Sequence, residues 1–296
     1  MRKTPQRDKL IAARANPKAL EDRDLLDEAI RAYERWIAKL SELTAKGEQR
    51  VLDATQLLNE YKDYLEVEIL ARQGSPFLKR QKGQLKLDNS IMEEFLIHMV
   101  QPEVIDGLPD ADFEVGPRTA FMTLSFRPES LESLGRKPAI VMKAKDQDFA
   151  IGRTIHFKAS PDADFRQSTT DNEHLFLAVL SAEIKVNLDK TMFQECCGTA
   201  SRLKQGCPSA RYYVLVEYLD MEPEDSRLTD IDNVFLLRHA KRLPSHKRSI
   251  YAEVRDQHRE HPIDGGVIYR FVQEIAEFLA AVWHDPDEAI RRGSFA

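Results

Sequence analysis

The sequence predicts an α/β fold, in which a mixed central sheet is flanked by helices and preceded by a helical hairpin. Apolar residues recur at helical spacing in residues 24–43 and again in residues 48–72. Further along the chain, apolar runs typical of strands alternate with helical patterns. The chain has 296 residues, 42% hydrophobic and 31% charged, so it is long and apolar enough to build a full core.

The helical hairpin occupies the N-terminal part of the chain. Its two helices are joined around Ala45-Lys46-Gly47, and we expect them to have a structural role. The next helix is predicted over SIMEEFLIHMV, residues 90–100. In this stretch Ser90 and Glu93 have the spacing of a capping box, which predicts that the helix begins there.

Five strand patterns follow this helix. Ile151-Gly152-Arg153 is expected to form a tight connection between the second and the third. A helix over KTMFQECCGTASRLKQ, capped by Asn187 or Asp189, separates the fourth from the fifth. The closing helix, 267–286, has one apolar side, which is either the back of the core or a dimer surface. The strands are expected at residues 119–126, 139–151, 154–159, 174–186 and 210–220.

Several classes of protein are excluded by composition. No apolar run approaches the roughly 20 residues of a membrane span, and the first 20 residues do not resemble a signal peptide, so we expect a cytoplasmic protein. The net charge of −6 argues against a protein that coats nucleic acid through bulk electrostatics, although a basic cleft remains compatible with it. Cys196, Cys197 and Cys207 match no zinc spacing, and we expect them to pack in the interior.

A charged pair interrupts the apolar strand that ends at residue 186. Because side chains alternate along a strand, Glu183 and Lys185 share one face while Ile184 lies on the other. A carboxylate and the carbonyl oxygen of Ile184 are hard ligands of the kind that Mg²⁺ prefers, and Lys185 can orient a water. Glu60-Tyr61-Lys62 has the same spacing on a polar helix, where we expect it to be merely solvated.

Phosphodiester cleavage at such a site needs a second carboxylate. Asp146 and Asp148 share one face of the preceding strand, and neighbouring strands place either near Glu183. We favour Asp148, which stands where polar sequence gives way to apolar sequence. Asp162 and Asp164, in the turn-like stretch SPDADF, are the competitors and rank lower.

An aspartate followed by a strand with Glu-x-Lys, a helix and a strand resembles the PD-(D/E)XK nucleases. More narrowly, EIKVNLDKTMFQE with TASRLK, PSARYYVLVEYLDM and KDQDFAIGR resembles type II restriction endonucleases that cut interrupted sites containing CTNAG. The resemblance is strongest over about residues 139–221. It implies a restriction-endonuclease-like core in a nuclease domain at 76–296, with a DNA-contacting and helical C-terminal extension, after a helical region at 1–75.

The resemblance also implies roles for single residues. Asp148, Glu183 and the carbonyl of Ile184 would hold Mg²⁺, and Lys185 would contact the attacking water and the scissile phosphate. Gln147 stands where the family has a proline, which leaves the choice between Asp146, Asp148 and Asp162 open.

Two polar residues outside the central motif take further roles by the same resemblance. Gln194 lies where related nucleases keep a polar residue near the site. Either Glu93 or Glu94 in SIMEEF resembles a glutamate of the first helix that reaches a metal-bound water in some of these nucleases, and we favour Glu94 because capping also accounts for Glu93.

Two basic stretches, residues 78–86 and 236–259, are expected to contact DNA. The predicted contacts are Lys79, Arg80, Lys82, Arg238, Lys241, Arg242, Lys247 and Arg248.

The expected activity is Mg²⁺-dependent hydrolysis of double-stranded DNA at a specific short sequence, leaving 5′-phosphates. We expect a homodimer, because two strands are cut, and a DNA methyltransferase as the genetic partner. The alternatives are a structure-specific repair or recombination nuclease and a non-catalytic DNA-binding protein on the same fold.

Overall fold

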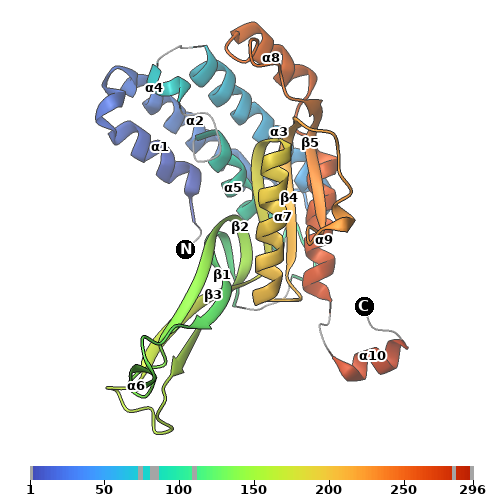
Figure 1. Cartoon of the computed structure of the whole chain (residues 1–296). Helices are drawn as coiled ribbons and strands as arrows, with labels where there is room; N and C mark the ends of the chain where they lie inside the picture. Colours follow the sequence, from blue (N-terminus) through green and yellow to red (C-terminus); the bar gives the residue numbers. More distant parts are fainter. Residues whose placement is uncertain (1–2, 73–75, 81–86, 109–111, 282–284, 294–296) are drawn as a thin grey trace.

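The computed structural model describes residues 3–72, 76–80, 87–108, 112–281 and 285–293. These residues form a group of helices, a five-stranded sheet and a long arm that extends from the sheet (Figure 1). The helices are α1 (Pro5–Ala15), η1 (Pro17–Asp22), α2 (Arg23–Glu42), α3 (Gly47–Asp63), η2 (Tyr64–Ala71), α4 (Pro76–Lys79), α5 (Leu87–Met99), α6 (Leu131–Leu134), α7 (Lys190–Gly206), η3 (Ser226–Leu228), α8 (Tyr251–Glu260), α9 (Gly265–Ala280) and α10 (Pro286–Arg292). The strands are β1 (Glu114–Phe126), β2 (Ile140–Ala159), β3 (Asp171–Leu188), β4 (Arg211–Leu219) and β5 (Asn233–Lys241).

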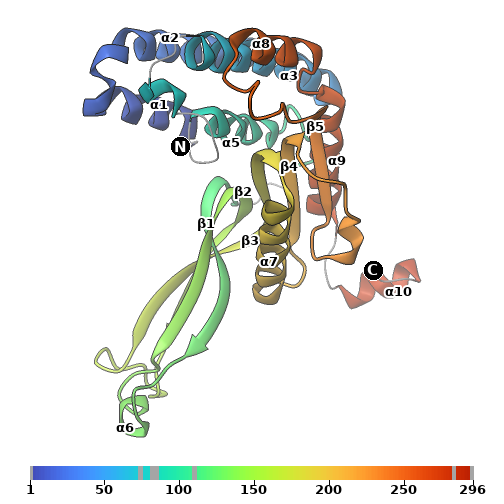
Figure 2. The ribbon, with the colours of Figure 1, turned by 45° about the horizontal axis from the view of Figure 1, so that its top comes forward.

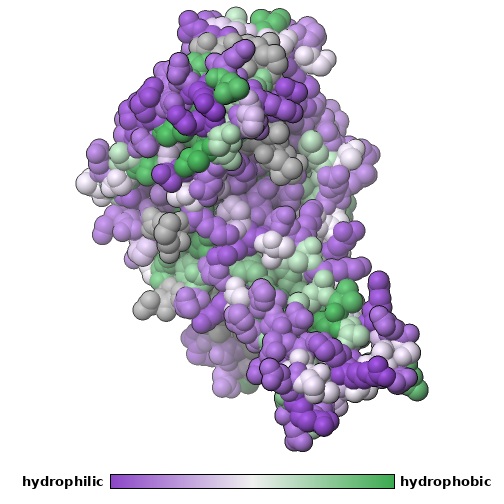
Figure 3. Space-filling view, turned by 90° about the vertical axis from the view of Figure 1, so that its left-hand side faces the viewer, coloured by the Kyte–Doolittle hydropathy of each residue, from purple (hydrophilic) through white to green (hydrophobic). Residues whose placement is uncertain are grey.

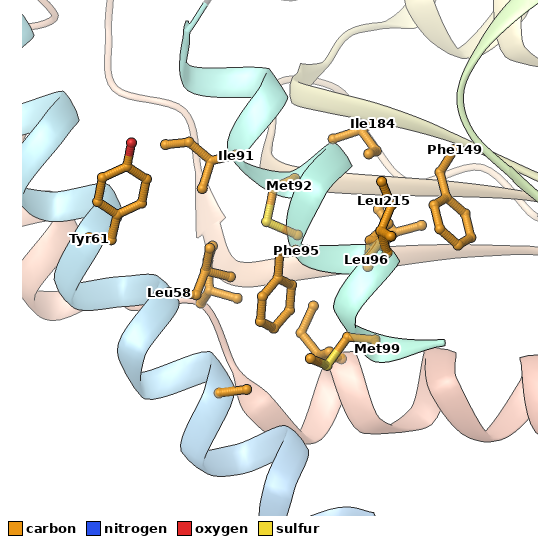
Figure 4. Packing of buried hydrophobic residues seen from close by; sticks show 14 of the residues in the cluster. Leu58, Tyr61, Ile91, Met92, Phe95, Leu96, Met99, Phe149, Ile184 and Leu215 are labelled. Carbon is orange, nitrogen blue, oxygen red and sulfur yellow. The ribbon is translucent and has the colours of Figure 1, made fainter. Parts of the chain in front are cut away.

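The N-terminal helices form the predicted hairpin and share one core with the sheet. Helices α2 and α3 are joined by a turn that ends at Gly47, whose φ of 55° favours glycine. Figure 4 shows how the core continues from this hairpin: Leu58 of α3 faces Phe95 of α5, and α5 in turn lies over Ile184 and Leu215 of the sheet. Helix α5 is therefore the layer that connects the hairpin to the strands.

The sheet is mixed, as the sequence predicts. β1 and β2 are antiparallel, as are β2 and β3, whereas β4 is parallel to both β3 and β5. Helix α7 covers one face through Phe193, Cys196 and Leu203, and α5 and α9 cover the other (Figure 2). The apolar side of α9 is buried against the sheet, with Ile268 and Phe271 at 0% exposure, so it is the back of the core.

β1, β2 and β3 extend beyond the helical layers as the arm, which carries α6 at its tip (Figures 1 and 2). The prediction of a tight turn at residues 151–153 is wrong, because β2 runs unbroken from Ile140 to Ala159. Gly152 lies where the pairing of β2 with β3 shifts register, and a Cβ there would come within 2.1 Å of the Leu177 carbonyl oxygen. The glycine thus permits a close approach of two strands.

The predicted caps differ in outcome. Asp189 caps α7 by accepting a hydrogen bond from the Met192 amide at 2.9 Å, as predicted. The capping box at Ser90 is wrong, because α5 begins at Leu87 and Ser90 lies inside it, donating to the Leu87 carbonyl at 3.2 Å. None of the helices described here is long and apolar enough to cross a membrane.

Candidate active site

The point where β2 and β3 separate brings two carboxylates together. Antiparallel pairing of these strands begins at Phe149 and Ala182, which places Asp148 beside Glu183. Asp148 Oδ2 accepts a hydrogen bond from the Ile184 amide at 2.8 Å. A side-chain carboxylate thus takes the place of a backbone carbonyl at the end of the ladder.

Glu183 and Lys185 form a buried ion pair on the face of β3 covered by α7. Their residues are 7% and 3% exposed, and Lys185 Nζ lies 2.6 Å from Glu183 Oε1. The Tyr212 hydroxyl donates to the other oxygen, Oε2, at 3.0 Å. The carboxylate orientation is therefore fixed from both sides by partners on β3 and β4.

Among the charged groups that act on Asp148, the acids outweigh Lys185. Burial raises the pKa of the Asp148 carboxyl, and the charge of Glu183 raises it further, to about 7. Glu93 on α5 acts in the same direction, while the Ile184 amide and Lys185 act against it. Carboxylates held close enough to raise the pKa of one of them are typical of a site that binds a cation.

Helix α5 turns Glu93, and not Glu94, toward Asp148. Glu93 is 5% exposed and pairs with Lys9 of α1 at 3.0 Å, so the first helix also reaches this site. Glu94 points into the helical part, where it accepts hydrogen bonds from the Gln6 amide at 2.9 Å and the Tyr33 hydroxyl at 2.6 Å. The structure therefore does not bring Glu94 to the pair.

The other candidates from the sequence lie apart from the pair. Asp146 is exposed and accepts a hydrogen bond from the Thr119 hydroxyl at 2.6 Å. Asp162 lies in the loop after β2, where it pairs with Arg166. Gln194 is exposed on α7. Of the three aspartates left open by the sequence, Asp148 is the one beside Glu183.

The prediction that Glu60 and Lys62 are both solvated is wrong for Lys62. Glu60 is exposed and pairs with Lys39 at 3.2 Å, as expected of a solvated glutamate. Lys62, in contrast, has a fully buried side chain and contacts Glu217 of β4 at 2.8 Å. Glu60 and Lys62 therefore do not form a surface pair, although they are two residues apart on a helix.

Arg238, a predicted DNA contact, lies in the interior. This residue is 1% exposed, and its Nε donates to Glu217 at 2.8 Å while Nη1 donates to the His261 carbonyl at 2.9 Å. A guanidinium enclosed in this way is not available to DNA, so the predicted contact is wrong for this residue. Lys62, Glu217 and Arg238 instead join α3, β4 and β5 through an interior ion network.

The remaining basic residues of the second stretch lie at the end of β5 or after it, and those of the first stretch lie at the end of α4 or after it. Lys241 has a 79% exposed side chain, and Arg242 and Arg248 approach Asp220 at 3.3 and 3.6 Å. Lys247 pairs with Glu253 at 3.1 Å. Arg80 is exposed, whereas Lys82 and the side chain of Lys79 lie outside the described residues.

The donor set fits a hard divalent cation. Asp148, Glu183 and the Ile184 carbonyl offer oxygen ligands, which Mg²⁺ prefers over nitrogen and sulfur. No cluster of three or more histidine, cysteine, aspartate or glutamate side chains within the described ranges has the geometry of a metal site. A cation held here would therefore complete its shell with backbone, water or substrate oxygens, as Mg²⁺ commonly does.

Two contributors to the site were missed from the sequence. Tyr212 belongs to the apolar strand ARYYVLVEYLD, and only the parallel register of β3 and β4, which pairs Ser181 with Tyr212, shows that its hydroxyl reaches Glu183. The other is Lys9, because nothing in the sequence around it indicates that it pairs with Glu93. Glu93 itself was the alternative to Glu94 and ranked lower because capping also explained it.

Comparison with known proteins identifies a family and a likeness in fold. The model of the Bpu10I restriction endonuclease family matches residues 84–295, which is most of the chain. A solved structure described as the native BbvCI A2B2 tetramer at low resolution has the same fold, with a TM-score of 0.66 and 17% sequence identity over 93% of this chain and 97% of that chain. No curated protein matches the sequence. The chain belongs to the Bpu10I restriction endonuclease family.

Proposed function

We propose that this type II restriction endonuclease hydrolyses double-stranded DNA with Mg²⁺ at the site formed by Asp148, Glu183 and Lys185, leaving 5′-phosphates. The observation that carries the proposal is the position of Asp148 beside Glu183, with a pKa raised by burial and by the second carboxylate. A buried glutamate beside a half-buried aspartate of the same charge is costly unless a cation joins them.

Each residue of this group has a task that its position supports. Asp148, Glu183 and the Ile184 carbonyl would hold Mg²⁺, which supplies a Lewis acid and a nucleophilic water when bound. Tyr212 keeps Glu183 oriented through Oε2. Lys185 lies 2.6 Å from Glu183, so its ammonium is placed to orient the attacking water and to stabilise negative charge on the phosphate.

DNA contact is assigned to the exposed basic residues. Arg80, Lys241, Arg242, Lys247 and Arg248 all have accessible side chains, and phosphate contacts of this kind position a duplex without reading its sequence. Lys79 and Lys82, the other basic residues of the first stretch, would also contact phosphates.

Assembly and genetic context complete the proposal. One site cuts one strand, so a homodimer would supply the second site for a double-strand break. A DNA methyltransferase would protect the host, and the recognised sequence would be an interrupted site containing CTNAG.

The experiment is digestion of unmethylated phage DNA with Mg²⁺ by the wild type, Glu183→Gln and Lys185→Met. Discrete fragments that disappear with either variant support the proposal, and sequencing of the ends gives the recognition site and the terminal phosphate. Glu60→Gln is the matched control, because Glu60 is an exposed glutamate whose lysine partner is also on the surface. Cleavage that survives both substitutions would place the chemistry elsewhere, and preference for branched over linear DNA would indicate a repair nuclease.

A further inference from the structure

A cleft of about 540 Å³ lies at the base of the arm, between β1, β2 and β3. Its lining includes Lys3, Arg118, Asp146, Gln147, His174 and Phe176. The cleft adjoins the candidate active site through β2, because Asp146 and Gln147 directly precede Asp148. Figure 3 shows the side of the molecule on which the helical part stands above the arm, and hydrophilic and hydrophobic residues are mixed on the surface between them.

Two polar atoms of the cleft lining are buried without a hydrogen-bond partner among the described residues. They are Gln147 Oε1, an acceptor, and Arg118 Nε, a donor. Gln147 is 2% exposed, and its amide nitrogen donates to the backbone carbonyls of Asp146 and Lys145 at 3.0 and 3.3 Å. Buried polar atoms are nearly always paired, so an unpaired donor and acceptor in the lining of one cleft indicate a ligand that supplies the opposite groups.

The rest of the lining favours a flat ligand over a bare phosphate. The Arg118 guanidinium lies over the Phe176 ring, 5.5 Å from its centroid, and its terminal nitrogen pairs with Glu114. This arrangement makes a planar wall, and Phe121 adds a further apolar surface. Asp146 would repel a phosphate but accepts hydrogen bonds from an amino group. Planar apolar faces with polar edges are the features of a nucleobase, which stacks on aromatic rings and guanidinium planes.

We propose that the cleft holds one unstacked nucleobase of the DNA substrate, next to the phosphodiester cut by the candidate site. The side chains of Gln147 and Arg118 turn toward the base, so that its exocyclic amino group donates to Gln147 Oε1 and a ring nitrogen or carbonyl oxygen accepts from Arg118 Nε, while the ring lies against Phe176. Adenine, cytosine and guanine have such an amino group and thymine does not, so the cleft discriminates against thymine. This inference rests on the proposed nuclease function and adds a specificity-determining contact to it.

The test uses the full-length enzyme and a duplex containing its recognised site. 2-Aminopurine replaces each base around the cut in turn, with Ca²⁺ in place of Mg²⁺, and its fluorescence rises when the base leaves the stack. The wild type is expected to brighten one position several-fold, and Gln147→Met and Arg118→Met are expected to abolish that rise while still binding the duplex. Arg127→Met is the matched control, because Arg127 is exposed on the arm outside the cleft.

Folding is checked by thermal melting. Gln147→Met keeps the side-chain length and removes an unpaired buried oxygen, but it also removes the amide hydrogen bonds to the Asp146 and Lys145 carbonyls, so its melting temperature should fall by no more than a few degrees. A wild type that binds and cuts the duplex without brightening any position would overturn the inference and leave the nuclease function standing.

A protein that is not a nuclease would give a different result in this experiment. If the wild type cuts no DNA, titration with dAMP, dCMP, dGMP and TMP at millimolar concentration decides the inference on its own. Movement of the Gln147 side-chain amide signals in nuclear magnetic resonance spectra by the amino-bearing nucleotides, and not by TMP, would support the cleft as a base site. Signals that stay in place with all four would refute it.

Discussion

Replacing Asp148 by asparagine should stabilise the folded protein at neutral and alkaline pH in the absence of divalent cations. The pKa of this carboxyl is raised from 3.8 to about 7 by burial and by Glu183. A shift of about three units corresponds to an upper limit of about 4 kcal/mol at 1.36 kcal/mol per unit, and partial solvent contact reduces the expected gain to about 2–3 kcal/mol. Asparagine retains Oδ1, which can still accept from the Ile184 amide.

The pH dependence has a definite sign. Because the folded pKa lies above the unfolded value, the contribution of Asp148 to stability is fully present below pH 3.8 and is lost as the pH rises to about 7. The advantage of Asp148→Asn should therefore be largest at pH 8 and less than half as large at pH 5. Asp146→Asn is the matched control on the same strand, where an exposed carboxylate should change stability by less than about 0.5 kcal/mol.

Urea unfolding at the two pH values, with circular dichroism as the signal, measures this difference. Mg²⁺ adds a second comparison, because a cation that binds only the folded state should stabilise the wild type and leave Asp148→Asn nearly unchanged. An asparagine variant that is equally or less stable at pH 8, with an unchanged denaturant slope, would refute the argument that Asp148 is strained by its neighbours.

Three further predictions concern the same site and the interior network. Cleavage at subsaturating Mg²⁺ should rise with pH up to about 7, since the cation competes with a proton for Asp148, and a flat profile between pH 6 and 8 would contradict this. Tyr212→Phe should weaken Mg²⁺ binding about 10-fold, measured by Mg²⁺-dependent cleavage, because Glu183 loses its 3.0 Å hydrogen bond, and unchanged Mg²⁺ dependence would exclude an orienting role. Arg238→Met should destabilise the fold by about 3–5 kcal/mol in urea unfolding by leaving Glu217 without its arginine, whereas a selective loss of DNA affinity in a stable protein would restore the DNA-contact interpretation.

Local patterns predicted those features that depend on neighbours in the sequence. Strand alternation places Glu183 and Lys185 on one face, and the structure shows them 2.6 Å apart on that face. Helical spacing likewise predicted the hairpin of α2 and α3 and the buried side of α9. In each case the information lies within one element, where the period of the backbone fixes the direction of each side chain.

Features that depend on two elements far apart in the sequence could not be predicted from local patterns. Arg238 appeared to belong to a basic surface because its partner, Glu217, lies on another strand and meets it only through the pairing of β4 with β5. The direction of Glu93 toward Asp148 depends on how α5 is rotated over the sheet, and a helix start at Leu87 removed the capping explanation. The sequence predicts a turn at Gly152 because it does not show that Leu177 approaches this glycine.

The two buried groups of charges differ in a way that separates structure from function. Burial alone raises the pKa of Glu217, but Lys62 and Arg238 together bring it below its ordinary value, so this network is balanced by its own cations. Asp148 is half-buried beside Glu183, and Lys185 does not prevent its pKa from rising. A balanced network needs nothing further from outside the protein. An acid-rich one gains most from a divalent cation, and this difference supports the proposal that the functional site is the one at Asp148.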